Sequence, residues 1–388
     1  MFLVLFWVFV SLIAYTYVIF PLLLVIRGWA WPRPYKSEEH ESLPFVSVII
    51  AAYNEEESIG EKLENILSLD YPRDCFEVVI ASDGSTDRTD AVIKEYEGQN
   101  IKLLSLPRQG KAAALNAAVS ASSGTILVFS DANSMYKADA LRALVRPFAD
   151  SQVGGVAGNQ VYLKKKGTSS VSIGERGYWD FDRIMKEAES KAGSTISATG
   201  AIYAIRRSLF QPVVEGVTDD FYTSTGVISQ GHRLVFASDA IAYEHAAGTS
   251  KVEFGRKVRV ITRGLRAIFI ARSELLNPFR YGFYSIQLIS HKVMRRLIVY
   301  LLLSLFFITP FLWTAGLFYQ LVMLGQLAFY SLGGLGFVLD GTRLGRMKIL
   351  TMPFYFCLVN AAVFLATINI MQGRQIKRWE PQREAKVL

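Results

Sequence analysis

The sequence predicts an α/β protein in which a mostly parallel sheet, covered by helices, is joined to an α-helical transmembrane region. Within residues 45–245, apolar runs typical of buried strands alternate with segments of helical periodicity. Outside them, residues 1–26, 297–339 and 349–371 contain no charged residue. The composition agrees, because 51% hydrophobic residues are too many for an ordinary soluble enzyme and 20% charged residues are too many for a pure transporter.

The first segment, residues 1–26, is expected to be a transmembrane helix, since about 20 apolar residues cross a bilayer. A cleaved signal peptide would have a basic start and a shorter apolar core, and neither is present. Arg27, Arg33 and Lys36 follow the run instead. The positive-inside rule then places the next domain in the cytoplasm, beneath the plasma membrane.

Residues 44–250 are expected to form that cytoplasmic domain. Its first strand-like runs lie at 45–54, 76–83, 101–107 and 125–133, and each precedes a helical pattern. Ligands of such sheets bind beyond the carboxyl ends of the strands. Three of the runs end in polar clusters: Tyr53-Asn54-Glu55, Ser82-Asp83-Gly84 and Asp131-Ala132-Asn133. One such ending is usually a helix N-cap, but three together predict a ligand site at one edge of the sheet.

The second half of the chain is expected to lie on and in the membrane. Residues 251–296 mix apolar and basic positions at helical spacing, which is typical of amphipathic helices at a membrane surface. Residues 297–372 are long enough for about three transmembrane helices, and 373–388 form a basic tail. Four crossings would place this basic tail outside. Either one apolar segment does not cross, or the tail folds against the interface.

The net charge of +8 admits nucleic acid as a partner, but the basic residues gather beside the apolar runs. We therefore expect membrane lipids, and no nucleic acid, as the partners of these charges. The two cysteines, Cys75 and Cys357, show no metal-binding spacing and are not expected to pair. This usage fits a domain in a reducing compartment.

Seven short motifs in one order resemble those of the membrane-embedded family 2 glycosyltransferases, the group of the cellulose, hyaluronan and poly-N-acetylglucosamine synthases. Each motif is weak alone, but all of them in order between these membrane segments are specific. The resemblance implies a GT-A-type, Rossmann-like domain that transfers a sugar from a nucleotide donor, expected to be UDP-linked, to a glycan or lipid-linked acceptor. The motifs are AAYNEE (51–56), ASDGSTDRT (81–89), GKAAALN (110–116), FSDAN (129–133), ATGAIYAIRR (198–207), TDDF (218–221) and RKVR (256–259).

The resemblance implies a donor site at the first three motifs. Asp83 would contact the nucleotide, and the alternative is a helix cap through Ser85 and Thr86. Lys111 follows Gly110 at a helix start and suits phosphate, because the ammonium and the helix N-terminus both attract anions; the alternative is a solvated lysine. Four further residues would lie beside the base: Ala52, Tyr53, Asn54 and Glu55.

Asp131 and Asn133 fall on the Asp-x-Asp motif of the family, which implies a Mg²⁺ or Mn²⁺ site. Breaking the bond between sugar and phosphate adds negative charge to the leaving diphosphate, and a cation held by hard oxygen ligands neutralises it. Asn133 departs from the motif: its carbonyl oxygen can ligate but carries no charge. The alternative is that Asn133 only shapes the turn.

Asp220 matches the last acid of the family's Thr-Glu-Asp motif and is the candidate catalytic base of an inverting transfer. Such a base takes the proton of the acceptor hydroxyl as it attacks the anomeric carbon. The adjacent Asp219 would raise the pKa of Asp220 by like-charge repulsion. Thr199, Gly200 and Asp219 are expected on the acceptor side. The alternatives are a helix cap for the two acids and a strand turn for Gly200.

Arg256 and Arg259 match the family's Gln-x-x-Arg-Trp motif only in part, since Arg replaces Gln and Val260 replaces Trp. Arg259 suits a diphosphate, because a guanidinium matches phosphate geometry, and lipid headgroups are the alternative ligand. The missing Trp argues against processive synthesis and favours single-sugar transfer to a lipid. Two other classes stay open: a membrane nucleotidyltransferase, and a scaffold or transporter without enzymatic activity.

Overall fold

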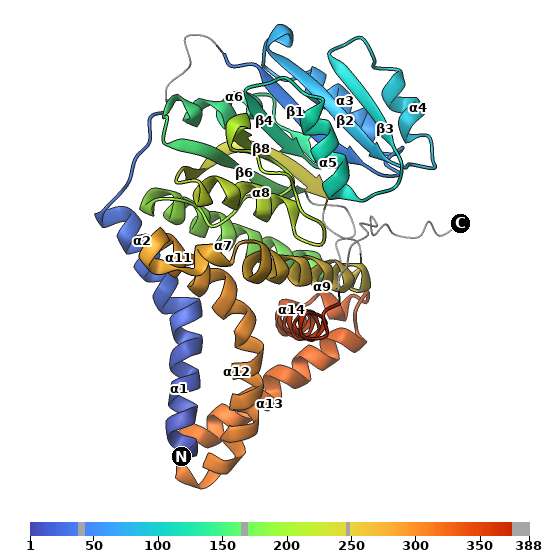
Figure 1. Cartoon of the computed structure of the whole chain (residues 1–388). Helices are drawn as coiled ribbons and strands as arrows, with labels where there is room; N and C mark the ends of the chain where they lie inside the picture. Colours follow the sequence, from blue (N-terminus) through green and yellow to red (C-terminus); the bar gives the residue numbers. More distant parts are fainter. Residues whose placement is uncertain (38–42, 164–169, 246–248, 375–388) are drawn as a thin grey trace.

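The computed structural model describes residues 1–37, 43–163, 170–245 and 249–374, and in it an α/β domain stands on a helical region (Figure 1). One eight-stranded sheet, in the order β3-β2-β1-β4-β7-β6-β8-β5, forms the centre of the domain. Its strands are β1 (Val46–Ala52), β2 (Phe76–Asp83), β3 (Ile101–Leu106), β4 (Ile126–Ser130), β5 (Met135–Tyr136), β6 (Val153–Leu163), β7 (Tyr203–Arg206) and β8 (Arg233–His245).

Strands β1 to β4 are mutually parallel, as the β-α alternation predicted. Val48 of β1 pairs with Val78 of β2 on one side and with Val128 of β4 on the other. Strands β1, β2 and β4 are buried on both faces, which explains their largely apolar sequences, whereas β3 at the edge of the sheet is partly exposed. The connecting helices are α3 (Ile59–Leu67), α4 (Thr89–Lys94), α5 (Lys111–Ser120) and α6 (Ala140–Val145).

The sheet turns mixed beyond β4. Strand β7 pairs antiparallel with both β4 and β6, and β8 runs parallel to β6. The apolar side chains of α3 and α6 pack on one face of the sheet, and those of α5 pack on the other. The sequence prediction of a mostly parallel, doubly covered sheet is therefore confirmed, with the antiparallel half as an addition that periodicity does not reveal.

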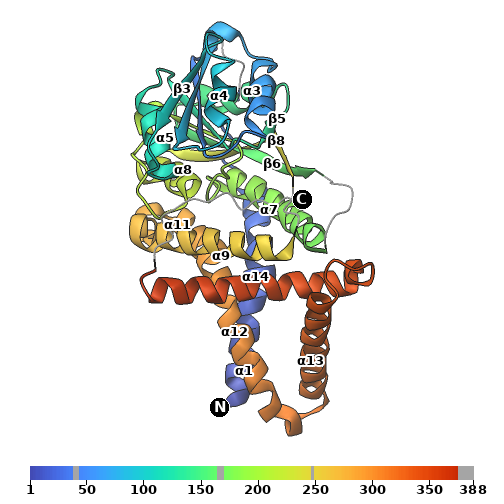
Figure 2. The ribbon, with the colours of Figure 1, turned by 90° about the vertical axis from the view of Figure 1, so that its right-hand side faces the viewer.

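Three helices lie between the sheet and the helical region: α7 (Ser170–Ala192), α8 (Asp219–Ser229) and α9 (Ser250–Arg266). Helix α9 starts at an N-cap, Thr249, whose side chain accepts a hydrogen bond from the backbone N–H of Val252. It continues into a π-helical turn, Ala267–Ala271, and the short helices α10 (Pro278–Tyr281) and α11 (Phe283–Gln287) follow. Figure 2 shows α9 between the α/β domain and the helix α14 (Lys348–Met371).

The helical region contains α1 (Phe2–Ala14), α2 (Phe20–Ala30), α12 (Arg295–Ile308), α13 (Leu317–Val338) and α14 (Lys348–Met371). By length and composition, four helical segments of the described chain suffice to cross a bilayer: Phe2–Ala30, Phe283–Ala315, Leu317–Val338 and Lys348–Met371. The predicted break near Pro310 is present as a 3-10 segment, Thr309–Ala315. The predicted basic tail lies beyond the described residues, apart from Gly373 and Arg374.

Candidate active site

The polar strand endings meet at one edge of the sheet. Because β2, β1 and β4 are parallel neighbours, their carboxyl ends lie side by side, and the residues that follow them face the same space. Asp83 closes β2 and Asp131 comes directly after β4. The N-terminus of α5 and that of α8 reach the same edge and contribute Lys111 and Asp219.

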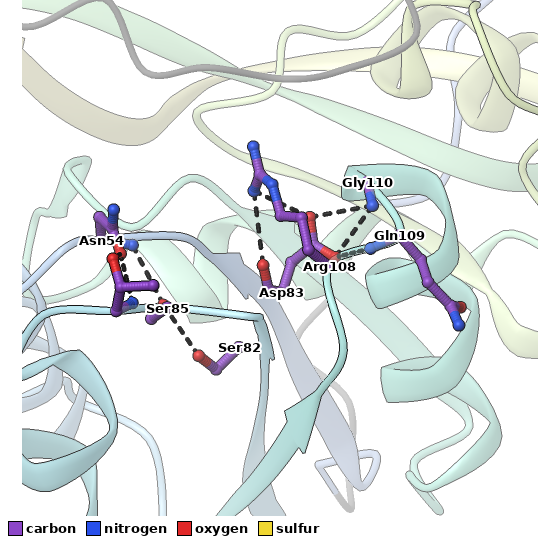
Figure 3. A network of polar contacts seen from close by, with 8 residues as sticks. Asn54, Ser82, Asp83, Ser85, Arg108, Gln109 and Gly110 are labelled. Atoms are coloured by element: carbon purple, nitrogen blue, oxygen red, sulfur yellow. Dashed lines mark hydrogen bonds and ion pairs between the residues drawn. The ribbon is translucent and has the colours of Figure 1, made fainter.

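Asp83 is almost fully buried and holds the loop that leads into α5 (Figure 3). Its carboxylate accepts hydrogen bonds from the backbone N–H groups of Gln109, at 2.7 Å, and Gly110, at 2.9 Å. The guanidinium of Arg108 forms an ion pair with it at 3.0 Å. Gly84 permits this approach: its φ is +68°, and a Cβ there would lie 2.8 Å from the backbone nitrogen of Arg108. The alternative of a cap through Ser85 and Thr86 is therefore not what these contacts show.

Tyr53 lies beneath the same arginine. The guanidinium carbon of Arg108 is 3.2 Å from the centre of the Tyr53 ring, a cation–π contact. Arg108 was not predicted as a site residue from the sequence. It lies two residues before Gly110, next to the helix start where Lys111 was expected to bind phosphate. The ring, the guanidinium and the buried Asp83 thus form one contact network at the strand edge.

The other three residues expected beside the base have structural contacts. Ala52 is fully buried in β1. Asn54 adopts the left-handed conformation with φ of 52°, and its side-chain oxygen accepts a hydrogen bond from the backbone N–H of Thr86 at 2.8 Å (Figure 3). The carboxylate of Glu55 accepts a hydrogen bond from Ser58 at 2.7 Å, at the start of α3. Asn54 and Glu55 thus shape the turns that present Tyr53.

Lys111, in the motif GKAAALN, contacts acids of two other motifs, FSDAN and TDDF. Its ammonium lies 2.8 Å from a carboxylate oxygen of Asp131 and 3.0 Å from one of Asp219. Burial alone would lower the pKa of Lys111, but the two carboxylates outweigh burial and raise it, so the lysine stays charged. The interpretation of a solvated surface lysine does not match this position. A positive charge is fixed at the point where the two acidic motifs meet.

The adjacent acids Asp219 and Asp220, at the start of α8, are driven in opposite directions. Burial would raise the pKa of Asp219, but Lys111 and Arg263 lower it overall. Burial, and then the charge of Asp219, raise the pKa of Asp220 to about 6. Two neighbouring carboxylates with separated pKa values are typical of an acid–base site. Asp219 is therefore the ionised partner of Lys111, and Asp220 has the higher pKa of the two acids.

The surroundings of Asp131 fit a divalent cation. The side chain is 32% exposed, so one oxygen can face a ligand while the other contacts Lys111. Gly200 lies against it, because a Cβ at this glycine would be 2.8 Å from Oδ2 of Asp131. Asn133 is exposed at the same turn. Among the described residues no cluster of three histidines, cysteines or acids exists, so a cation here would complete its shell with donor oxygens and water.

Gly200 and Thr199, expected on the acceptor side, lie beside this group. The hydroxyl of Thr199 is buried without a hydrogen-bond partner among the described residues, as is that of Tyr203. The ring of Tyr203 stacks on Phe129 at 4.8 Å, and burial, followed by Asp219 and Asp220, raises its pKa. Tyr203 could not be singled out from the sequence, because a tyrosine inside an apolar strand is usually a core residue.

Helix α9 brings arginines to the site from the membrane side. Burial, and then Arg263 and Arg256, lower the pKa of Arg259, while Asp131 and Asp219 act in the opposite direction, so Arg259 belongs to this cluster. Arg256 is engaged elsewhere, with Glu253 at 2.8 Å and the hydroxyl of Tyr162 at 3.3 Å. Arg263 was not predicted; it is buried and donates a hydrogen bond to the backbone carbonyl of Val217 at 2.9 Å.

Residues 47–213 match the glycosyl transferase family 2. The chain is 38% identical over 133 residues to a beta-monoglucosyldiacylglycerol synthase of Nostoc sp., which is 33% of this chain and 28% of that protein. It is 28% identical over 193 residues to a poly-beta-1,6-N-acetyl-D-glucosamine synthase of Staphylococcus epidermidis, 48% of this chain and 46% of the relative. The matches thus span less than half the length of these curated relatives.

The whole fold is similar to that of the mannosyltransferase PcManGT from Pyrobaculum calidifontis, solved in complex with GDP-Man and Mn²⁺. The TM-score is 0.72 at 24% identity, and the match covers 96% of this chain and 100% of the other. The sheet, the strand-edge site and this similarity define a GT-A glycosyltransferase fold. The chain carries a family 2 glycosyltransferase domain, and the resemblance seen in its motifs is confirmed.

Proposed function

We propose that this protein transfers a sugar from a nucleotide-sugar donor to an acceptor at the membrane surface, with inversion at the anomeric carbon. The observation that carries the proposal is the position of Lys111, which links Asp131 of the metal motif to Asp219 of the base motif. The ammonium of Lys111 would therefore lie beside both the diphosphate of the donor and the motif that carries the candidate base, Asp220. The donor is expected to be UDP-linked.

In this proposal the donor nucleoside lies on the surface made by Tyr53, Arg108 and Asp83, and its diphosphate reaches Lys111 and Arg259. Asp131 and Asn133 would hold Mg²⁺ or Mn²⁺, which supplies positive charge for the leaving diphosphate. Asp220 takes the proton of the acceptor hydroxyl as its oxygen bonds to the anomeric carbon. The bond between that carbon and the diphosphate breaks, and the nucleoside diphosphate leaves with the bonding pair.

The acceptor is a glycan or a lipid-linked molecule, and two features favour a single transfer to a lipid. Val260, where the polymerising relatives of the resemblance carry Trp, is 42% exposed on α9 and offers no ring for a sugar chain. The first relative described above has a name that specifies a glycosylated diacylglycerol. Helix α9, which packs on the apolar helix α14, also brings Arg259 to the site. We place the domain in the cytoplasm.

The test is release of nucleoside diphosphate by the detergent-purified full chain, with a panel of nucleotide sugars, Mn²⁺ or Mg²⁺, and membrane lipid extract as acceptor. Asp220→Asn should lower the rate by about 10²–10⁴-fold, because it removes a general base. Donor binding, measured by calorimetry, should stay within a few-fold of the unchanged chain. An active Asp220→Asn variant would overturn the assignment of the base. Release of pyrophosphate from a nucleoside triphosphate would indicate a nucleotidyltransferase instead.

A further inference from the structure

The four apolar segments do not all run in one direction. In both views α1 and α12 extend away from the catalytic domain, whereas α14 is seen end-on in Figure 1 and lengthwise across the view in Figure 2. Helix α14 thus lies crosswise to α1 and α12, beneath α9. We propose that α14 is a membrane-surface helix in the leaflet next to the catalytic domain, and that the chain crosses the bilayer three times, through residues 2–30, 283–315 and 317–338. This proposal does not depend on the proposed function.

The far end of the membrane region is marked by contacts among three segments. Phe6, near the N-terminus, packs in a buried cluster with Leu305 and Leu312, at the end of the second segment. The ring of Trp7 stacks on that of Phe318, at the start of α13, with 5.7 Å between the centroids. The first crossing therefore begins at this far end and the second crossing ends there. Helix α13 also starts at this end and runs back towards the catalytic domain.

Both halves of α14 lie at the opposite, near end. In its first half, Leu350 and Pro353 contact the last turns of α13, where a Cβ on Gly336 would lie 2.8 Å from the carbonyl oxygen of Leu350. In its second half, Ala366 shares a buried cluster with Val299, just after the start of α12. A helix of 24 residues is about 36 Å long. If it crossed, its second half would lie near the far end of α12, not beside Val299.

The partner of α14 is a helix that cannot enter the hydrocarbon core. Along one direction, Phe254 of α9 packs against Phe354 and Leu358, and Leu265 then packs against Ala366, so the two helices lie side by side. Placing the six basic residues of α9 in hydrocarbon is strongly unfavourable. Helix α9 must therefore stay at the surface and α14 with it. These basic residues are Lys251, Arg256, Lys257, Arg259, Arg263 and Arg266.

The face of α14 turned away from α9 is apolar and suits lipid acyl chains. Ile349 and Met352 are 60% and 65% exposed, and Phe364 and Leu365 follow on the same helix. No charged residue lies between 349 and 371. With the basic helix α9 packed on its other face, α14 would lie at the boundary between lipid headgroups and acyl chains.

Three crossings also place the charges of the chain on one side. Residues 1–26 and 297–339 contain none. In this arrangement all 42 lysines and arginines lie on the catalytic side, with Arg27, Lys292, Arg295 and Arg296 at the ends of two crossings on that side. The loop on the other side, 309–316, is uncharged. A fourth crossing would carry the basic tail 373–388 to that side, against the positive-inside rule.

The first test labels single cysteines with a membrane-impermeant maleimide in cells that express the full chain, in a Cys75→Ser and Cys357→Ala background. Thr314→Cys should react in intact cells. Gln99→Cys in the catalytic domain, Thr342→Cys and Leu388→Cys should react only after permeabilisation. Reaction of Leu388→Cys in intact cells, with Thr342→Cys still protected, would overturn the proposal. A C-terminal epitope tag on the chain with its native cysteines, probed by protease in intact cells, repeats the test without cysteine removal.

The second test measures depth. A fluorescent probe on Ile349→Cys, Asn360→Cys or Met371→Cys, in vesicles with brominated lipids, reports how far each position lies from the bilayer centre. These positions are 11 residues apart and so lie on one face of the helix, and a helix at the surface should give similar quenching depths at all three. A crossing helix would place position 360 deepest, near the bilayer centre, and that profile would contradict the proposal.

Discussion

At the scale of single residues, the charge state of Asp220 links the structure to a pH dependence. Burial and the neighbouring Asp219 raise the pKa of Asp220 to about 6. A general base acts only in its ionised form, so kcat at saturating donor should fall as the pH drops through about 6 and reach a plateau above it. A rate profile between pH 4.5 and 8.5 would measure this. A rate that is constant across pH 6 would mean that Asp220 does not carry the proton.

Asp219→Asn tests the cause of that shift. Removing the like charge should lower the pKa of Asp220 and move the acidic limb of the profile to lower pH. Asp219 also contacts Lys111 at 3.0 Å, so the maximal rate should fall as well. The informative quantity is therefore the pH at the midpoint of the acidic limb, not the maximal rate. An unchanged position would indicate that a group other than Asp220 titrates.

Gly200 is predicted to control Asp131, the carboxylate that we propose binds the divalent cation. A Cβ at Gly200 would lie 2.8 Å from Oδ2 of Asp131, and Gly200→Ala must displace that side chain. We expect the half-saturating Mn²⁺ concentration to rise about 10-fold or more, as for other residues that orient a metal ligand. Gly60→Ala is the matched control, because its Cβ would meet Val92 at an ordinary 3.5 Å. Equal effects of the two substitutions would refute this role.

At the scale of the elements, a buried polar network holds the turn between β4 and β5, which carries Asp131 and Asn133. The hydroxyl of Ser134 donates to the carboxylate of Glu244 on β8 at 2.6 Å. The ammonium of Lys62 on α3 donates to the carbonyl of Ser134 and lies 3.9 Å from the centre of the Tyr136 ring. The amide of Gln160 on β6 donates to the other oxygen of Glu244. Three elements thereby fix the turn.

Glu244→Leu should therefore weaken donor and metal binding more than it slows turnover. The apolar side chain removes both acceptor oxygens, so Ser134 and Gln160 lose their shared partner and the turn loosens. We expect KM for the donor and the half-saturating Mn²⁺ concentration to rise several-fold. Glu77→Leu is the control: this carboxylate accepts from Ser47 at 2.7 Å at the opposite edge of the sheet, and its substitution should affect stability alone. A fall in kcat without a change in KM would argue against positioning.

The elements that the sequence predicted are those whose apolar pattern is local. The strands ending at Ala52, Asp83 and Ser130 and the helix starting at Lys111 follow from their periodicity and turn residues. The antiparallel strand β7 does not follow from a local pattern, because it pairs with β4, whose partner residues lie 74 to 80 positions earlier in the chain.

The site divides in the same way. Asp83, Lys111, Asp131 and Asp220 stand at strand or helix ends, where a polar residue after an apolar run is visible in the sequence. Other residues that build the site lie inside apolar or basic stretches, where nothing distinguishes them before the fold is known. These are Lys62, Tyr203, Glu244 and Arg263.

At the scale of the whole molecule, α9 couples the membrane helices to the catalytic site. One face of α9 packs on α14 through Val258, Ile261 and Leu265. Another carries Arg259, whose charge acts on Asp131 and Asp219, and Arg263, which holds the segment before α8. A shift of α14 relative to α9 would therefore move two arginines of the site, although α14 itself contributes no residue there among those described.

Ala366→Phe tests this coupling. Ala366 is fully buried in the cluster between α14 and α9, and a ring there should separate the helices at a cost of about 1–3 kcal/mol. We expect a lower Tm and a several-fold lower rate of sugar transfer, although residue 366 belongs to the membrane region. Ala361→Phe is the matched control, since residue 361 is exposed on the same helix and can place its ring among lipids. Equal rates for the two variants, with only the Tm of Ala366→Phe reduced, would show that α14 stabilises α9 without influencing the arginines of the site.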